Sequence, residues 1–237
     1  RIVITAGAKP ENVIVFDSKG ALHSGREDVK KDPRFYRKWE LCQTTNLAKI
    51  DGFDEAMKGA DALIALSKPG PDVVHPDSVK LMGKKPIVFA CANPVPEIYP
   101  YAAKEAGAFI VATGRGDFPN QVNNSVGFPG ILKGALLTRS KKISDEMAIG
   151  AAYSLARFAE KRGITPDNII ATMEETDVFP HEAADVAVQS VKEGLSRVDM
   201  SWDDVYRRTK EDIQYSRGLV SKMIDDGYIK VPDQKMI

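Results

Sequence analysis

Four short runs of apolar residues, separated by segments with helical periodicity, set the pattern of the first half of the chain. The runs cover residues 13–16, 62–66, 86–90 and 108–112. None of them alternates apolar with polar residues, and such runs are typical of strands buried in a parallel sheet. Strands that alternate with helices form a doubly wound α/β fold, in which helices cover both faces of the sheet. The sequence therefore predicts a doubly wound α/β domain.

The second half of the chain changes to longer helical patterns without obvious strands. Helices are predicted at residues 129–138, 145–162, 182–194 and 202–227. The second of them is the clearest, because Ser144 is a suitable N-cap, acidic Asp145 lies in the positive first turn, and Gly163 ends the pattern. We therefore expect an α/β domain over residues 1–142 and a C-terminal helical segment over residues 143–237.

The start of the chain does not fit this pattern. A further apolar run, residues 2–4, is separated from the run at 13–16 by only eight residues. Parallel neighbours need a crossover of a dozen or more residues, usually a helix. Gly7 has the character of a helix C-cap. We infer that a Gly-rich turn and most of a helix are missing from this chain after Ile4; the alternative is an antiparallel edge pair joined by a loop.

Composition and charge narrow the classes of partner. Lys+Arg and Asp+Glu are equal at 33 each, so there is no basic surface for nucleic acid or an anionic membrane. No apolar stretch approaches the roughly 18 residues of a membrane span, and the start of the chain is no signal peptide. Cys42 and Cys91 lack metal or redox spacing, which favours a reduced cytoplasmic compartment. His181 has no second histidine at metal-binding spacing, so we predict no metal site here.

Polar residues follow the predicted strands at their carboxyl ends, where open α/β sheets bind ligands. Asp17 would accept hydrogen bonds from the ribose hydroxyls of a dinucleotide, although residues 17–20 also fit a simple turn. Lys19 would instead attract a 2′-phosphate, so NAD and NADP both stay open. Residues 67–70 and Asn93 follow two further strands. The carboxamide of Asn93 can donate to a carboxylate and accept from a hydroxyl, whereas Asn-Pro also begins turns.

Four carboxamides lie within five residues beyond the last strand. They are Asn120, Gln121, Asn123 and Asn124. Beside apolar Phe118 and Phe128, such a cluster suits a small polar ligand held against a nicotinamide ring. Capping of the following helix by Asn123 or Asn124 is the alternative explanation.

Four motifs in this order carry a resemblance to a known family. They are VFDSKG (15–20), ALIALSKPG (62–70), FACANPVPEI (89–98) and TGRGDFPNQVNNSVGFPGI (113–131). Together they resemble the malic enzyme family, most closely its short bacterial and archaeal form. The last two motifs are highly specific, and the resemblance runs along nearly the whole chain.

The resemblance implies a Rossmann-like NAD(P)-binding domain and the oxidation of malate, with NAD or NADP, followed by decarboxylation to pyruvate. It implies Mg²⁺ or Mn²⁺ as the metal, a small-molecule substrate, a homodimer, and neither nucleic acid nor a membrane as partner. The substrate-binding residues carried over are Asn93, Asn123 and Asn124. The cofactor-binding residues carried over are Asp17, Ser67, Lys68, Pro69, Gly70 and Asn93.

The departures from the family are also informative. The Gly-rich phosphate loop expected after Ile4 is missing, and the N-terminal domain with the catalytic Tyr and Lys and the acidic metal ligands has no counterpart here. We therefore expect no catalytic residue and no metal ligand within this chain. Two other functions stay open: another NAD(P)-dependent 2-hydroxy-acid or amino-acid dehydrogenase, and a non-catalytic nucleotide-binding module.

Overall fold

The computed structural model describes residues 1–230, which fold into two compact units. The first unit contains Arg1–Asn123 together with Arg162–Ile170, and the second contains Asn124–Lys161 and the chain from Ala171 onward. The sequence predicted a boundary after residue 142, whereas the units divide before residue 124. Helix α7 (Asn124–Leu137) therefore belongs with the C-terminal helices.

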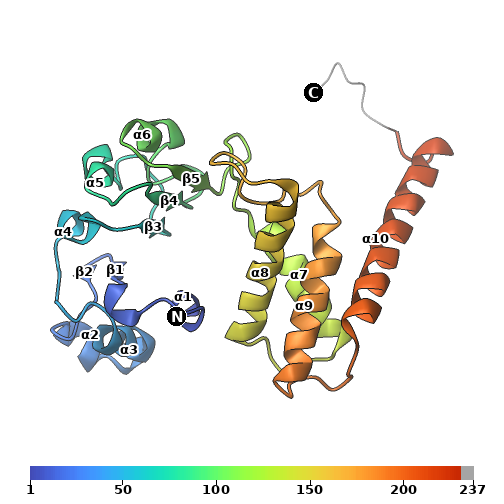
Figure 1. Ribbon diagram of the computed structural model, residues 1–237, viewed down its shortest axis with the longest axis horizontal. Helices are drawn as coiled ribbons and strands as arrows, with labels where there is room; N and C mark the ends of the chain where they lie inside the picture. Colours follow the sequence, from blue (N-terminus) through green and yellow to red (C-terminus); the bar gives the residue numbers. More distant parts are fainter. Residues whose placement is uncertain (231–237) are drawn as a thin grey trace. The chain divides into compact units, whose positions relative to one another are not determined.

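A three-stranded parallel sheet forms the centre of the first unit (Figure 1). Its strands are β3 (Ala62–Ala65), β4 (Ile87–Ala90) and β5 (Ile110–Thr113), paired in this order. The crossover helices are α5 (Pro76–Lys80) and α6 (Pro100–Glu105). Both helices begin with proline, which needs no N–H donor at that position. The structure confirms the parallel sheet and the α/β class that the sequence predicted.

Helices cover one face of this sheet. On that face Ala65, Val88 and Val111 are buried in a core that also contains Met57 of α4 (Phe53–Met57). On the opposite face Ile64 is 51% exposed, and Leu66, just beyond β3, is 77% exposed. The helices of the first unit, within residues 1–230, thus supply one of the two helical layers that the sequence predicted. The uninterrupted apolar runs did not reveal this difference between the faces.

The N-terminal segment departs from the two strands predicted there. Ile2–Thr5 forms a helical turn, α1, and Gly7 follows it with φ +110°, a conformation that favours glycine. After the 3₁₀ turn η1 (Pro10–Asn12), only Phe16–Asp17 pairs, as β1, antiparallel to β2 (Gly20–Ala21). Neither run joins the parallel sheet: the strand prediction for residues 2–4 is wrong, and of the run 13–16 only Phe16 lies in a strand. Eight residues are too few for a crossover between two parallel strands, and the first run forms a helical turn instead.

The remaining elements of the first unit are short helices. They are α2 (Glu27–Lys31), the 3₁₀ turn η2 (Pro33–Phe35) and α3 (Tyr36–Thr44). Leu22, Val29 and Cys42 form a small core between them and the hairpin of β1 and β2. This cluster is separate from the core under the parallel sheet, and it positions the loop that carries Asp17.

The second unit is helical, as predicted. It contains α7, α8 (Asp145–Arg162), α9 (Val178–Lys192) and α10 (Trp202–Asp225). The range of α8 is confirmed, and its N-cap Ser144 accepts a hydrogen bond from the Met147 backbone N at 3.1 Å. The predicted start of α7 at Pro129 is wrong, because the helix begins at Asn124 and holds the proline inside it.

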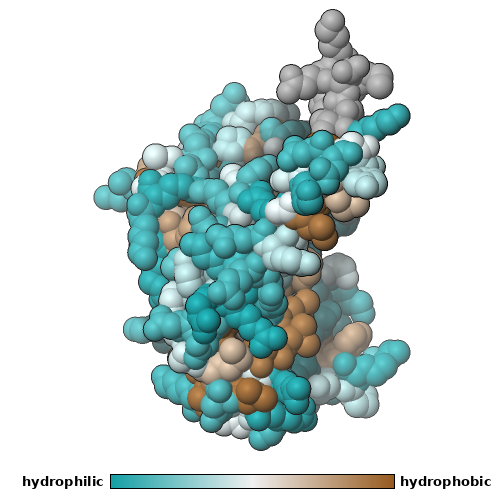
Figure 2. Space-filling view, turned by 90° about the vertical axis from the view of Figure 1, so that its right-hand side faces the viewer, coloured by the Kyte–Doolittle hydropathy of each residue, from teal (hydrophilic) through white to brown (hydrophobic). Residues whose placement is uncertain are grey.

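Helix α10 is long and exposes both polar and apolar side chains. The exposed apolar residues in its second half are Tyr215, Leu219, Val220, Met223 and Ile224. Figure 2 views the molecule from the side on which α10 is drawn in Figure 1, and it shows hydrophobic patches between mostly hydrophilic residues. Within residues 1–230, no helix combines the length and the apolar character needed to cross a membrane.

Candidate functional site

The loops that follow β3 and β4 are joined by one buried side chain. Glu97 is fully buried, and its Oε1 accepts hydrogen bonds from the backbone N of Ser67 at 2.7 Å and from the Ser67 hydroxyl at 3.1 Å. Its Oε2 accepts one from the backbone N of Ala92 at 2.9 Å. The backbone N of Gly70 also donates to the carbonyl of Val95 at 3.3 Å. These bonds hold residues 67–70 and the Asn93 loop together at the carboxyl edge of the sheet.

Arg115 joins the loop after β5 to the same edge. Its Nη1 donates to the carbonyl oxygen of Pro94 at 2.9 Å, and its Nε donates to Asp117 at 2.7 Å. Its backbone N donates to the Thr113 hydroxyl at 3.2 Å. The peptide bond between Asn93 and Pro94 is cis. Three successive strand-end loops are thus connected by the side chains of one glutamate and one arginine.

Asn93 is a predicted site residue whose side chain is available to a ligand. It is exposed, and its carboxamide has no hydrogen-bond partner among residues 1–230. A Cβ atom on Gly114 would lie 3.5 Å from Asn93 Nδ2 and 3.4 Å from the carbonyl oxygen of Cys91. A side chain at position 114 would therefore fill the space beside the carboxamide. Glycine leaves that space open.

Among the four carboxamides after β5, Asn120 has a structural role. Its Nδ2 donates to the carbonyls of Val111 at 3.0 Å and Pro166 at 2.8 Å, and its Oδ1 accepts from the backbone N of Ile169 at 2.9 Å. These bonds fasten residues 162–170 to the sheet. Asn120 therefore has little capacity left for a ligand.

After Asn120 the chain passes beside the end of β5 and leads to the other two predicted residues, Asn123 and Asn124. The backbone N of Val122 donates to the carbonyl of Thr113 at 2.8 Å, which brings Asn123 to the edge where Asn93 lies. Asn124 is exposed and begins α7 in the second unit. The shared contact of Asn93, Asn123 and Asn124 with one ligand stays a prediction.

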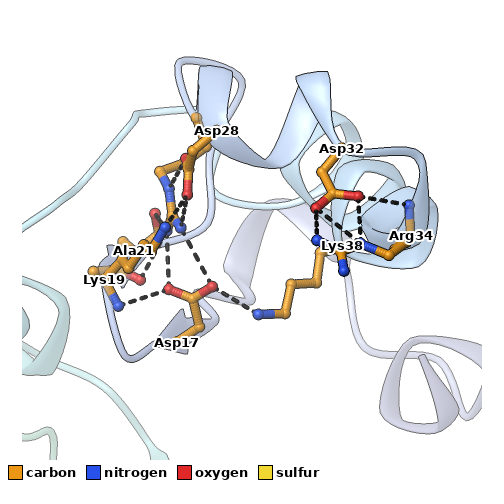
Figure 3. A network of polar contacts seen from close by, with 9 residues as sticks. Asp17, Lys19, Ala21, Asp28, Asp32, Arg34 and Lys38 are labelled. Atoms are coloured by element: carbon orange, nitrogen blue, oxygen red, sulfur yellow. Dashed lines mark hydrogen bonds and ion pairs between the residues drawn. The ribbon is translucent and has the colours of Figure 1, made fainter.

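Asp17 is held by basic groups at the turn between β1 and β2, as Figure 3 shows. Its Oδ1 accepts from Arg26 Nη1 at 3.1 Å and from the backbone N of Lys19 at 2.9 Å. Its Oδ2 accepts from Arg26 Nη2 at 3.3 Å and from Lys38 Nζ at 2.8 Å. Burial raises the pKa of Asp17, but these hydrogen bonds outweigh it and lower the pKa to about 2. Four donors fill the acceptor sites of a carboxylate, so a ribose hydroxyl must displace one of them.

Sequence reasoning missed the partners of these residues. Arg26 and Lys38 lie 9 and 21 positions beyond Asp17, and no motif spacing indicates the contact. Glu97 gave a weak signal, because it is a charged residue in the otherwise apolar stretch 95–98. No group of three or more His, Cys, Asp or Glu side chains that could hold a metal ion is found in residues 1–230.

Comparison with known proteins adds the identity of the family. The model described as "Malic enzyme, NAD binding domain" matches residues 4–193. The chain belongs to the malic enzyme family. It is 37% identical over 201 residues to the bifunctional malic/malolactic enzyme of Bacillus subtilis, covering 84% of this chain and 48% of that protein. It is 36% identical over 200 residues to the NAD-dependent malic enzyme of Geobacillus stearothermophilus, covering 84% and 40%.

Solved malic enzyme structures show the same fold. The crystal structure of the Entamoeba histolytica malic enzyme superposes with a TM-score of 0.96 at 62% identity, over 99% of this chain and 49% of that chain. The malic enzyme of Pyrococcus horikoshii gives a TM-score of 0.86 at 41% identity, over 95% and 52%. The chain thus spans about half the length of these malic enzymes. The comparisons confirm the resemblance and leave the individual site residues as predictions.

Proposed function

We propose that the protein to which this chain belongs oxidises malate with NAD or NADP and decarboxylates the product to pyruvate and CO2. The observation that carries the proposal is the family match over residues 4–193. The joined loops at the carboxyl edge of the sheet support it, because open α/β sheets bind dinucleotides there. A homodimer and a cytoplasmic location are part of the proposal and come from the resemblance alone.

In this proposal the chain binds and orients the reactants. Residues 67–70 line the dinucleotide, whose nicotinamide accepts the hydride when it is bound. The unpartnered carboxamide of Asn93 donates to a malate carboxylate, and Asn123 and Asn124 contribute further amide groups from the next loop. Gly114 keeps the space beside Asn93 open for that ligand. These contacts fix the C2 hydrogen of malate toward the ring, which is a positioning role.

The surroundings of Asp17 favour NADP over NAD. Lys19, Arg26 and Lys38 supply three positive charges against the two carboxylates of Asp17 and Asp28, which these basic groups contact at 2.8–3.5 Å. A 2′-phosphate would meet this positive excess, whereas a ribose hydroxyl would have to displace a donor from Asp17. We therefore propose NADP as the preferred cofactor.

The metal of the proposed reaction does not fit the described part of the chain. Mg²⁺ and Mn²⁺ take oxygen ligands from several carboxylates or carbonyls, and residues 1–230 offer no such acidic cluster. The curated relatives extend well beyond the match, and we propose that the metal ligands lie in that additional portion. The role proposed for this chain is limited to binding the dinucleotide and malate.

The test is an assay of NAD(P)H and pyruvate formation by the full-length protein with malate, Mn²⁺ and either dinucleotide. Asn93→Ala should raise the malate KM roughly ten- to hundredfold, because it removes a hydrogen bond to a charged group worth about 1.5–3 kcal/mol. The KM for the dinucleotide, to whose site Asn93 is also assigned, should rise much less. Gln214→Ala, on exposed α10, is the control and should match the unsubstituted enzyme.

Two outcomes would contradict the proposal. If folded, metal-loaded protein forms neither NAD(P)H nor pyruvate, malate oxidation is excluded as its activity and a non-catalytic module is favoured. An equal loss of malate and dinucleotide affinity in Asn93→Ala, together with turnover of another 2-hydroxy acid, would favour the alternative dehydrogenase. Detection of pyruvate rather than accumulated oxaloacetate separates decarboxylation from simple oxidation.

A further inference from the structure

A pocket of about 190 Å³ lies within the second unit, between α8, α9 and the start of α10. Its wall includes Ser154, Phe158 and Lys161 from α8, His181 from α9 and Trp202 from α10. None of these residues belongs to the predicted cofactor or substrate site. The polar and ring groups that converge on this pocket have no role in the function proposed above.

Aromatic rings form one side of the pocket. The ring centroids of His181 and Trp202 are 5.6 Å apart, and those of Phe158 and His181 are 6.4 Å apart. Tyr206 stacks on Trp202 with centroids 5.0 Å apart and an interplanar angle of 12°, which fixes the indole in place. The planes of Phe158 and Trp202 are tilted by 57° and 51° to that of His181, so each ring offers its own apolar face to the pocket.

The charge in the pocket is positive. Asp185 also lines the wall, but Arg157 forms an ion pair with its Oδ2 and the Trp202 Nε1 donates to its Oδ1 at 2.8 Å. Lys161 lies one helical turn beyond Arg157 on α8 and has no ion-pair partner among residues 1–230. The acid is thus compensated within the fold, whereas the ammonium of Lys161 is not.

Two further polar side chains in the wall lack partners. Ser154 is 2% exposed, and its hydroxyl makes no hydrogen bond with any other residue of the described chain. The imidazole of half-buried His181 makes none either within residues 1–230. Burial lowers the pKa of His181, and the charge of Lys161 lowers it further, so the ring is neutral near pH 7 and offers one N–H donor. The Ser154 hydroxyl and the His181 imidazole can therefore form hydrogen bonds with a ligand without breaking a bond within the described chain.

We propose that this pocket binds a small organic carboxylate with a flat apolar body. The carboxylate accepts hydrogen bonds from Lys161, Ser154 and His181, and the body lies against Phe158 and Trp202. An apolar molecule would leave the ammonium and the hydroxyl unpaired, and an inorganic anion would leave the rings uncovered. Drug-sized ligands occupy roughly 300–1,000 Å³, so this smaller pocket suits a compact molecule. The proposal is independent of malate oxidation.

Fluorescence of Trp202 can report binding, because the 237 residues contain only one other tryptophan, Trp39. In full-length protein with Trp39 and any tryptophan outside these residues replaced by Phe, benzoate should change the Trp202 emission and reach saturation. Lys161→Gln should weaken benzoate binding at least tenfold, and Ser154→Ala should weaken it severalfold. Lys192→Gln removes an exposed lysine from the end of α9, outside the pocket wall, and should leave binding unchanged. Acetate and inorganic phosphate should bind more weakly than benzoate.

Three results would overturn the proposal. The first is a Trp202 emission change that rises linearly with benzoate concentration and does not saturate. The second is an equal effect of Lys161→Gln and Lys192→Gln on benzoate affinity, and the third is phosphate binding as tight as benzoate binding. If the Trp39 substitution prevents folding, the imidazole resonance of His181 in the unsubstituted protein provides the same test. A bound carboxylate stabilises the imidazolium, so saturating benzoate should raise the His181 titration midpoint, and an unchanged midpoint would contradict the proposal.

Discussion

Two fully buried glutamates show how differently the same side chain behaves in this fold. Glu97 accepts three hydrogen bonds from two loops. Glu182 on α9 has no partner of normal geometry for either oxygen within residues 1–230, and it packs against Gly130 of α7. Burial raises the pKa of Glu182 to about 8, and the nearby backbone N–H of Gly130 offsets only part of that rise. At neutral pH most Glu182 side chains are therefore protonated in the folded protein.

This environment makes stability depend on pH. Because the folded pKa of Glu182 lies above the unfolded value, its contribution is complete below about pH 4.5 and is lost as pH rises toward about 8. In the unsubstituted protein, Glu182 should lower the free energy of unfolding by roughly 3–5 kcal/mol as the pH rises across this window. The Glu182→Gln variant should not show this decrease. Guanidinium unfolding followed by circular dichroism at several pH values measures it, with exposed Glu160→Gln as control. An identical pH dependence in the unsubstituted protein and in the Glu182→Gln variant would contradict the expectation.

Glu97→Gln tests the connection between the strand-end loops. The amide keeps the shape, but its NH₂ group must face a backbone donor, either Ser67 N or Ala92 N. A buried N–H left unpaired costs about 1–3 kcal/mol, so we expect faster amide exchange at those two positions and a lower melting temperature. Glu105→Gln, exposed at the end of α6, should change neither. Unchanged exchange at positions 67 and 92 would show that the loops do not depend on this carboxylate.

The limits of sequence reasoning at this scale follow from distance along the chain. Asn93 was predicted as a site residue because strand ends are visible in the apolar pattern and a carboxamide directly follows one; its role stays a prediction. Arg26 and Lys38 were not found, because they approach Asp17 only through the fold of α2 and α3. Asn120 was grouped with its amide neighbours, yet its bond to the Pro166 carbonyl depends on a segment 46 positions away.

At the scale of elements, α7 and α9 pack closely because α7 carries glycines where it meets its neighbour. A Cβ at Gly134 would lie 2.9 Å from the Cβ of Val186 and would overlap the carbonyl oxygen of Ala183. We expect Gly134→Ala to destabilise the protein by about 1–3 kcal/mol, even though alanine favours a helix. Gly218 on α10 has open space around it, so Gly218→Ala should stabilise by roughly 0.5–1 kcal/mol. Thermal unfolding measures the change in melting temperature of both variants. A shift in the same direction for Gly134→Ala and Gly218→Ala would contradict the expectation.

Helix prediction succeeded where local signals agreed and failed where they competed. Helix α8 has an N-cap, an acidic first turn and a terminating glycine, and its bounds agree with the prediction. In α7 the proline at position 129 indicated a helix start, but the packing against α9 extends the helix back to Asn124. The apolar residues 2–4 have strand propensity and no strand beside them, so local propensity gave the wrong element.

At the scale of the whole molecule, the α/β class followed from alternating strands and helices, whereas the exposure of one sheet face did not. Strand β3 lies at an edge of the sheet, and Ile64 and Leu66 add apolar surface beside it. An exposed apolar edge strand promotes association between chains. We expect the 237-residue chain to self-associate with rising concentration.

Leu66→Lys should reduce that self-association without changing the circular dichroism spectrum. Leu47→Lys is the control, because Leu47 is 65% exposed and lies outside the sheet. Sedimentation velocity over a range of concentrations measures both variants. Equal self-association of the two would show that this face is not responsible.

The single carboxylate of Glu97 also has a consequence for how the two proposed reactants would affect each other's binding. Residues 67–70 and Asn93 share one rigid support, so a displacement of either loop changes the free energy of the other. If residues 67–70 bind the dinucleotide and Asn93 binds malate, as proposed, the dinucleotide should alter the affinity for malate, and malate must alter the affinity for the dinucleotide by the same factor. Cooperative binding of the two reactants would follow from this coupling without any larger movement of the protein.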